Sequence, residues 1–279
     1  PVMKKAKKRT IYWKLFRFIF FLFLVFCIAF FVAGGTSLFA PRTWQHVGDF
    51  LPKLENQPPA IQQLDEPVQI STADRLSRFI FLKRAVESRT KRENYVKLRD
   101  IPESLQQAIV AVEDNRFYSH HGFDTEGIIR AALVNIQYGQ IEEGASTITQ
   151  QLVKNLFLSH EQSFGRKAEE LLLALDMEAN YSKDEILELY LNTIYYGSNF
   201  YGIHDAANGY FGKKPSELQL PESAMLAGLP NAPSVYSPYT DFIMAKKRQF
   251  VVIDAMVRSG YIDENTAESA KIKPIYLAH

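Results

Sequence analysis

The chain is poor in the residues that build disulfides and metal centres. Cys27 is the single cysteine among 279 residues, so the monomer can form no internal disulfide and no cysteine-ligated metal cluster. It lies inside a charge-free stretch, residues 18–40, which leaves no cysteine nucleophile in the rest of the chain. The six histidines show no H-E-x-x-H or comparable ligand spacing, and the adjacent His120 and His121 cannot both face one ion from a helix. This pattern disfavours a metal centre and favours a hydrogen-bonding role for His120 in a turn.

Positive charge is scarce beyond the first residues. Seven of the 32 Lys and Arg residues precede residue 18, where no acid occurs, and the remaining 25 face all 31 Asp and Glu residues. The body of the chain is therefore mildly acidic, with a net charge near −6, and no basic stripe runs through it. This distribution argues against nucleic acid as a partner.

The charge-free stretch reads FIFFLFLVFCIAFFVAGGTSLFA. As a helix its 23 residues would reach about 35 Å, enough to cross a hydrocarbon core of about 30 Å. Because the cations precede it, we predict a cytoplasmic basic segment (residues 1–17), a single N-terminal transmembrane helix (18–40) and an extracytoplasmic body. The alternative is a cleaved signal peptide, whose apolar core is usually shorter, about 7–15 residues.

Five prolines between residues 41 and 67 predict an extended stalk before the main domain, residues 68–279. At the start of that domain, PVQIS and NYVKL have the composition of two short strands, and residues 72–93 between them allow a hairpin, a membrane-facing flap or a helix. From Ile101 onward the apolar spacing is helical. We therefore expect a mostly α domain with a minor strand element at its start.

Side-chain signals mark where several of these helices begin. Asp124 is the expected N-cap of one helix and Ser146 or Thr147 of the next, while Ser182 with Glu185 forms an S-x-x-E capping box. The helix that includes GRKAEELLLALDMEANY is expected to bury a broad apolar face, made of Leu171, Leu172, Ala174, Leu175 and Met177.

The stretch AIVAVEDNRFYSHHGFD carries an apolar helix directly into two carboxylates, Glu113 and Asp114. Packed apolar surface beside Glu113 would desolvate its carboxyl and raise the pKa, which suits a general acid or base near neutral pH. Asp114 points to another side of the helix, so the two acids are not a stacked pair. From this stretch alone a metal site, an acid–base site and a solvated helix end all remain open.

A second polar group lies in GASTITQQLVKN, where Ser146, Gln150 and Lys154 recur at every fourth residue. Thr147, Gln151 and Asn155 form the neighbouring stripe. Amides and hydroxyls suit sugar recognition, and a lysine suits a phosphate. In RKAEE, Arg166 and Glu170 share a helix face, and taken alone they indicate an ordinary ion pair worth a few tenths of a kcal/mol.

Together these stretches resemble glycosyltransferase family 51, the peptidoglycan glycosyltransferases. EDNRFYSHHG matches the family pattern E-D-x-x-F-x-x-H-x-G, and GASTITQQLVKN matches G-x-S-T-x-x-Q-Q-x-x-K-N. RKAEELLLALDME matches R-K-x-x-E, and KDEILELYLNTIYYG matches the helix motif that follows, in the family's order and spacing. The resemblance covers about residues 95–275 and implies a lysozyme-like, mostly α head lobe with a smaller jaw lobe that dips into the outer leaflet.

The resemblance also implies an activity and roles. Lipid II, the acceptor, would be joined to a nascent glycan chain on undecaprenyl pyrophosphate, with inversion to a β-1,4 bond, at the outer face of a bacterial cell membrane. Glu113 corresponds to the general base and Glu170 to a second functional carboxylate near the donor phosphates. Lys154 and Arg166 correspond to cations that neutralise the leaving pyrophosphate. The other expected substrate-binding residues are Asp114, Phe117, Ser146, Gln150, Gln151, Asn155 and Tyr195.

The expected partners are lipid II, the glycan chain, the membrane and moenomycin-type inhibitors, with cell-wall or division proteins as a further option. No cofactor is obligatory, although a divalent cation, Mg²⁺ or Mn²⁺, at the donor pyrophosphate is compatible with the pattern. Two other functions stay open. One is a lysozyme-like lytic muramidase with Glu113 as general acid, in which Lys154 and Arg166 would meet no phosphate. The other is an inactive, membrane-anchored scaffold that binds lipid II. Members of the family occur as monofunctional enzymes or as the N-terminal domain of bifunctional penicillin-binding proteins, in which a transpeptidase domain follows, and both arrangements stay open.

Overall fold

The computed structural model describes residues 82–90, 93–138, 146–158 and 164–278. The predicted transmembrane helix, the proline-rich stalk and the proposed strand PVQIS all lie outside these residues. Among the described residues no helix is both long and apolar enough to cross a membrane. The described part belongs to one compact unit, residues 56–279.

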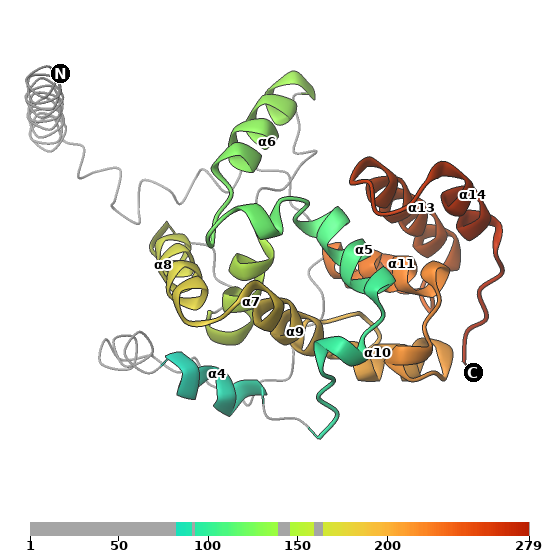
Figure 1. Cartoon of the computed structure of the whole chain (residues 1–279), viewed down its shortest axis with the longest axis horizontal. Coiled ribbons are helices and arrows are strands. Elements are labelled where there is room, and N and C mark those ends of the chain that lie inside the picture. Colours follow the sequence, from blue (N-terminus) through green and yellow to red (C-terminus); the bar gives the residue numbers. More distant parts are fainter. Residues whose placement is uncertain (1–81, 91–92, 139–145, 159–163, 279) are drawn as a thin grey trace, which may run out of the picture. The chain divides into compact units, whose positions relative to one another are not determined.

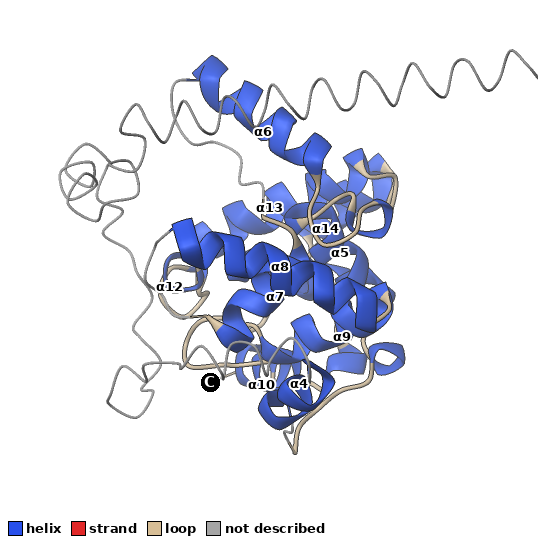
Figure 2. Cartoon of the chain, turned by 90° about the vertical axis from the view of Figure 1, so that its left-hand side faces the viewer, coloured by secondary structure: helices blue, strands red, loops and turns tan. Residues whose placement is uncertain are grey.

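The expectation of a mostly α domain is confirmed, because the ordered elements within the described ranges are helices and no strand is present there (Figure 2). The α-helices, in chain order, are α4 (Leu82–Thr90), α5 (Glu103–Glu113), α6 (Thr125–Tyr138), α7 (Ile148–Phe157), α8 (Phe164–Asn180), α9 (Lys183–Thr193), α10 (Ile203–Phe211), α11 (Leu220–Gly228), α12 (Pro233–Tyr236), α13 (Phe242–Arg258) and α14 (Glu264–Ile272).

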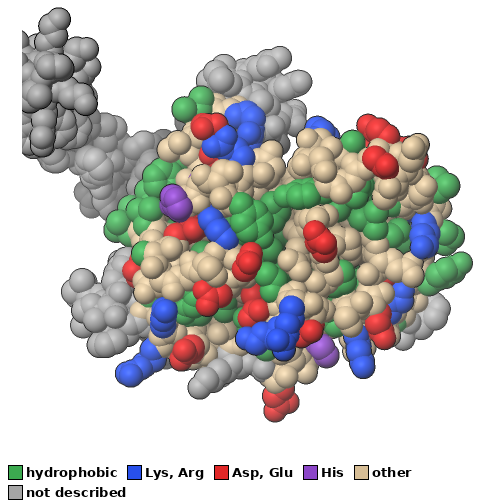
Figure 3. Space-filling view, viewed as in Figure 1, with side chains coloured by type: hydrophobic (Ala, Val, Ile, Leu, Met, Phe, Trp, Pro, Cys, Tyr) green, Lys and Arg blue, Asp and Glu red, His purple; other side chains and the backbone are tan. Residues whose placement is uncertain are grey.

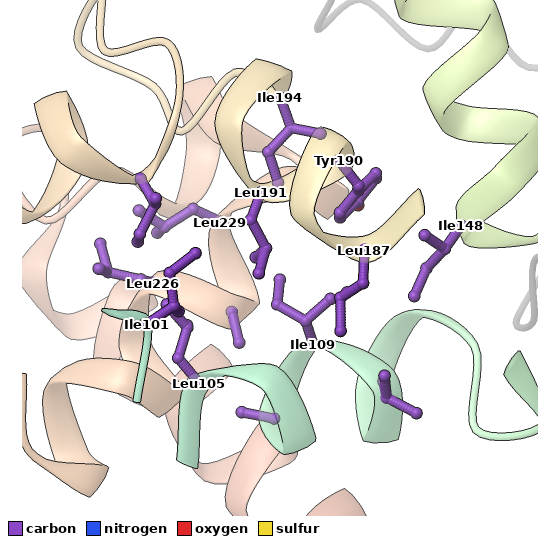
Figure 4. Packing of buried hydrophobic residues seen from close by; sticks show 14 of the residues in the cluster. Ile101, Leu105, Ile109, Ile148, Leu187, Tyr190, Leu191, Ile194, Leu226 and Leu229 are labelled. Atoms are coloured by element: carbon purple, nitrogen blue, oxygen red, sulfur yellow. The ribbon is translucent and has the colours of Figure 1, made fainter. Parts of the chain in front are cut away.

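The helices that pack most closely form two groups. On one side α5 packs against α11 and α13, and on the other side of the domain α7 packs against α8 and α9 (Figure 1). Buried side chains from α5, α7 and α9 share one continuous core, in which Ile109, Ile148 and Leu187 converge (Figure 4). The C-terminal end of α5 is therefore held beside α7, although 34 residues of sequence separate Glu113 from Thr147.

The strand prediction for NYVKL is wrong. Residues 95–97 have no regular structure, and a short 3-10 turn, Leu98–Asp100, follows them. The side chain of Asn192 on α9 takes the place of a strand partner: its Oδ1 accepts from the Val96 amide at 2.8 Å, and its Nδ2 donates to the Val96 carbonyl at 2.8 Å. Because a side chain satisfies both backbone groups, the extended segment needs no sheet. The preceding segment, whose type was left open, contains helix α4.

The capping signals are confirmed. Thr147 is the N-cap of α7 and forms a capping box with Gln150, and Ser182 forms the expected box with Glu185 at the start of α9. At the start of α6, Asp124 Oδ1 accepts from the Glu126 amide at 3.1 Å. These bonds satisfy amides that would have no partner in the first helical turn.

The predicted apolar face of α8 is only partly correct. Ala174 and Met177 are buried, as is Leu173, which was not expected on that face. In contrast, Leu172 is 55% exposed and Leu175 is 39% exposed. On α6, Ile128 and Ile129 are likewise exposed, at 45% and 61%. Both helices thus present apolar side chains outward as well as inward.

Candidate active site

Glu113 ends α5, as the sequence suggested. The preceding residues Ala108–Ala111 are buried in the core, so the helix delivers the carboxyl to the edge of packed surface. Its Oε2 accepts a hydrogen bond from Gln151 Nε2 of α7 at 2.9 Å. Its Oε1 is shielded from solvent and meets no hydrogen-bond partner among the described residues.

The environment of Glu113 favours its protonated form more than water does. Burial raises the pKa of the carboxyl, and the charge of Asp114 adds a smaller effect in the same direction. The hydrogen bond from Gln151 and the positive charges of Arg248 and Lys154 oppose that rise. A desolvated carboxyl with one free oxygen and nearby cations can exchange a proton at that oxygen, which is what a general acid or base requires.

Asp114 points away from Glu113 into a buried junction. Its Oδ2 lies 2.9 Å from His120 Nε2 and accepts from the Ile148 amide, in the first turn of α7, at 3.1 Å. Asp114 and His120 are 8% and 7% exposed, and Phe117 beside them is fully buried. The expected hydrogen-bonding role of His120 is therefore observed. For Asp114 and Phe117 these contacts show a structural position, and their substrate-binding role stays a prediction.

Gly122 lets the turn after α5 pack closely against the backbone of α8. Its φ is +81°, and an added Cβ would lie 3.1 Å from the Ala174 backbone carbon and oxygen. Its carbonyl accepts from Thr147 Oγ1 at 2.8 Å, so the turn after α5 is tied to the N-cap of α7. Glycine is required here because side chains disfavour this backbone conformation and because the space is filled.

Lys154, Arg166, Lys167 and Glu170 form a charged cluster between α7 and α8. Glu170 is 2% exposed; Arg166 Nη1 lies 3.7 Å from its Oε2, and Lys167 Nζ contacts its Oε1. Two cations on one buried carboxylate make this more than the exposed intrahelical pair that the spacing alone indicated. Lys167 also donates to Ser146 Oγ at 3.4 Å, which brings the predicted Ser146 into the same cluster.

Lys154 connects this cluster with Glu113. Part of Lys154 is exposed to solvent, but protein atoms surround its ammonium, and this burial lowers the pKa of the ammonium. The charge of Glu170 opposes this effect most strongly, Arg166 and Lys167 add to it, and Glu113 opposes it weakly. Gln151, which donates to Glu113, and Lys154 are three residues apart on α7 and therefore lie on the same side of that helix. Figure 3 shows acidic and basic side chains interspersed on the face turned toward the viewer, with hydrophobic side chains near its centre.

The remaining predicted residues have mixed positions. Gln150 is 4% exposed, and its Oε1 accepts from the Thr147 amide in the capping box at 3.0 Å. Asn155 is exposed on α7. Tyr195 lies beyond α9, where its ring packs against Tyr201 with centroids 4.7 Å apart. No contact with the acidic and basic cluster is seen for these residues, so their substrate-binding roles stay predictions.

Three residues near the site were missed by sequence reasoning. Lys167 lies in the R-K motif and could have been found there. Tyr190 donates to Gln151 Oε1 at 3.1 Å, but its place in ELYLN indicates only a core position. Arg248 on α13 influences Glu113 from 135 residues further along the chain. No local pattern marks it, because only the packing of α13 on α5 brings it there.

The described residues offer few ligands for a divalent cation. No three His, Cys, Asp or Glu side chains gather as ligands anywhere in the described ranges. Glu170, the carboxylate of the charged cluster, is already engaged by Arg166 and Lys167. An all-protein ligand cage for Mg²⁺ or Mn²⁺ therefore does not fit these residues.

Comparison with known proteins places these motifs in a family. The transglycosylase family model matches residues 81–257. Penicillin-binding protein 1A of Haemophilus influenzae is 40% identical over 256 residues, which are 92% of this chain and 27% of that protein. Penicillin-binding protein 1A of Aquifex aeolicus is 48% identical over 181 residues, covering 65% of this chain and 25% of that protein. The chain thus spans about a quarter of the length of these relatives.

A crystal structure of penicillin-binding protein 1A from Haemophilus influenzae is also similar, with 28% identity and a TM-score of 0.41 over 68% of this chain and 19% of that one. The family assignment depends on the sequence match, which covers more than half of the chain and includes the motifs of Glu113, Lys154 and Glu170. The chain therefore belongs to the transglycosylase family and is an enzyme of the peptidoglycan glycosyltransferase class.

Proposed function

We propose that the chain polymerises lipid II into β-1,4-linked glycan strands, with inversion at the donor sugar and release of undecaprenyl pyrophosphate. The observation that carries the proposal is the arrangement on α7: its Gln151 donates to the buried acid Glu113 at 2.9 Å, and its Lys154, three residues later, is influenced by the charges of Glu170, Arg166 and Lys167. One end of this arrangement can take a proton and the other can receive negative charge, as transfer from a pyrophosphate donor requires.

In this reaction Glu113 Oε1 accepts the proton of the acceptor sugar's 4-hydroxyl while that oxygen attacks the donor. A positioned general base contributes about 10²–10⁴-fold to the rate. Lys154 and Arg166 neutralise the charge that develops on the leaving pyrophosphate, and fixed cations in a partly desolvated site do so without reorganising. Glu170 holds Arg166 and Lys167 in place through its two contacts.

A divalent cation stays an optional part of the proposal. Because no group of three His, Cys, Asp or Glu side chains gathers among the described residues, Mg²⁺ or Mn²⁺ would take most of its ligands from phosphate oxygens and water, which is common for Mg²⁺. Neutralisation by Lys154 and Arg166 does not depend on such an ion.

We also propose that the enzyme works at the outer surface of a bacterial membrane, anchored by residues 18–40 with the N-terminus in the cytoplasm. On α6 the neighbours Ile128 and Ile129, and on α8 Leu172 and Leu175, are exposed apolar side chains of the kind that contact with lipid would cover, which supports this placement. External protease on intact spheroplasts should digest the body and leave a protected N-terminal fragment. A mature protein that begins near residue 34 or 41 would contradict the anchor.

The test of function is the product formed from labelled lipid II. Polymer is expected; fragments released from preformed glycan would indicate a muramidase, and binding without turnover would indicate a scaffold. Glu113→Gln should lower the initial rate at least 10²-fold, the smallest usual contribution of a positioned base. Glu103→Gln is the matched control, because Glu103 is an exposed acid on the same helix, and its rate should stay unchanged. Retention of more than about a tenth of the rate in Glu113→Gln would show that another group is the base.

A further inference from the structure

Tyr190 is a fully buried tyrosine with a hydroxyl in the active-site network. It projects from α9 on the side that faces Ile148 of α7 (Figure 4). Its hydroxyl donates to Gln151 Oε1 at 3.1 Å. Buried hydroxyls need a partner, and here that partner is the amide that also contacts the general base.

The Gln151 amide has two chemically different ends. Its Nε2 donates to Glu113 Oε2 at 2.9 Å, while its Oε1 accepts from Tyr190. If the amide turned over, its oxygen would face the carboxylate and repel it, because an ionised carboxylate can only accept hydrogen bonds. The carboxylate therefore keeps the nitrogen on its own side, and the amide oxygen faces Tyr190. The Tyr190 hydroxyl donates to that oxygen, and this second hydrogen bond holds the amide in the orientation that supports the carboxylate.

We propose that Tyr190 is a positioning residue that acts through Gln151: it holds Oε2 of Glu113 in a hydrogen bond and leaves Oε1 turned toward the acceptor hydroxyl. The proposal rests on the proposed function, since it concerns the base of that reaction. Oε1 is buried without a hydrogen-bond partner among the described residues, as expected for an oxygen that awaits substrate.

The same chain of hydrogen bonds affects when the base is ionised. Around Glu113, α13 contributes the charge of Arg248, α7 that of Lys154, and Asp114 lies next to it, while α9 contributes the neutral hydroxyl of Tyr190. The Gln151 hydrogen bond is the largest influence that lowers the pKa of Glu113 against burial. Burial raises the pKa of Tyr190 well above its ordinary value, so the hydroxyl keeps its proton and remains a donor at neutral pH.

The experiment is the pH dependence of polymerisation by the full chain, in detergent with labelled lipid II, for wild type and Tyr190→Phe. The variant should be about tenfold slower at neutral pH, the loss expected for one weakened hydrogen bond of ordinary strength. The acidic limb of its pH–rate profile should move upward by about one unit, so that the deficit shrinks at higher pH.

Tyr196→Phe is the matched control. Tyr196 is also a fully buried tyrosine, but its hydroxyl lies 3.5 Å from the Leu191 carbonyl and is not bonded to Gln151. This variant should keep the wild-type limb. Gln151→Leu removes the middle of the same hydrogen-bonded chain and should reproduce the upward shift of the acidic limb. It therefore tests the proposal even if Tyr190→Phe does not fold. The double variant Tyr190→Phe with Gln151→Leu should show no further shift.

A direct titration separates this proposal from the proposed function. The carboxyl carbon of Glu113 can be followed by carbon-13 NMR in the labelled chain and assigned by its absence in Glu113→Gln. An upward-shifted Glu113 titration in Tyr190→Phe supports the positioning role even if wild type forms no polymer, an outcome that would reject the polymerase function alone. An unchanged titration and an unchanged acidic limb in Tyr190→Phe would overturn the proposal, whatever the loss of rate.

Discussion

Replacing Asp114 by alanine is expected to unfold the active-site turn although Asp114 is not assigned to the chemistry. The Asp114 carboxylate is hydrogen-bonded to His120 Nε2 at 2.9 Å and to the Ile148 amide at 3.1 Å, and both Asp114 and His120 are buried. Hydrogen bonds to a charged group contribute about 1.5–3 kcal/mol each, so losing two should lower the free energy of unfolding by about 3–6 kcal/mol. For a domain of this size that corresponds to a melting temperature lower by roughly 10–20 °C.

The measurement is urea unfolding followed by circular dichroism at the helical band, with Asp100→Ala as control. Asp100 has a 58% exposed side chain, and its ion pair with Arg99 is long, 3.9 Å, so its loss should change stability by less than about 1 kcal/mol. Asp114→Ala and Asp100→Ala with equal midpoints would refute the structural role. A raised KM for lipid II with intact stability would instead support the substrate-binding role that the motif suggested for Asp114.

Three further predictions follow from the site. Burial raises the pKa of Glu113 above its ordinary value of 4.5, so between 4.5 and the raised pKa the folded state binds a proton that the unfolded state has lost, and the stability of wild type falls as pH rises through that window. In urea titrations, Glu113→Gln should therefore gain stability relative to wild type as pH increases above 4.5. A stability difference that stays constant with pH would contradict the desolvation of Glu113. Lys154→Ala and Arg166→Ala should each weaken binding of moenomycin-type phosphoglycolipids by about 1.5–3 kcal/mol in calorimetry, whereas unchanged affinity in both would remove their phosphate role. Gly122→Ala should lower the melting temperature, because a φ of +81° is strained for alanine and the added Cβ would lie only 3.1 Å from the Ala174 backbone. A wild-type melt would show that the turn can move away from α8.

Local chemistry made several features of the chain predictable. The capping residues Thr147 and Ser182 were recognised because an N-cap depends on residues three positions apart. The end of α5 at Glu113 was also predictable from local sequence, because an apolar helical run stops there. The strand at NYVKL was mispredicted because β-composition cannot reveal that Asn192, almost a hundred residues later, satisfies the Val96 backbone.

The sequence by itself determined the family and the mostly α class and predicted which two carboxylates act in the site, because these depend on residue types at fixed local spacing. Only the tertiary structure decided what each polar group meets. In the folded chain, Asp114 is buried and accepts from the Ile148 amide, and Glu170 contacts both Arg166 and Lys167. Tyr190 and Arg248 likewise come close to Glu113 only through the packing of α9 and α13. These relations depend on which helix faces pack together, and that outcome is set by the burial of the whole core rather than by any one segment.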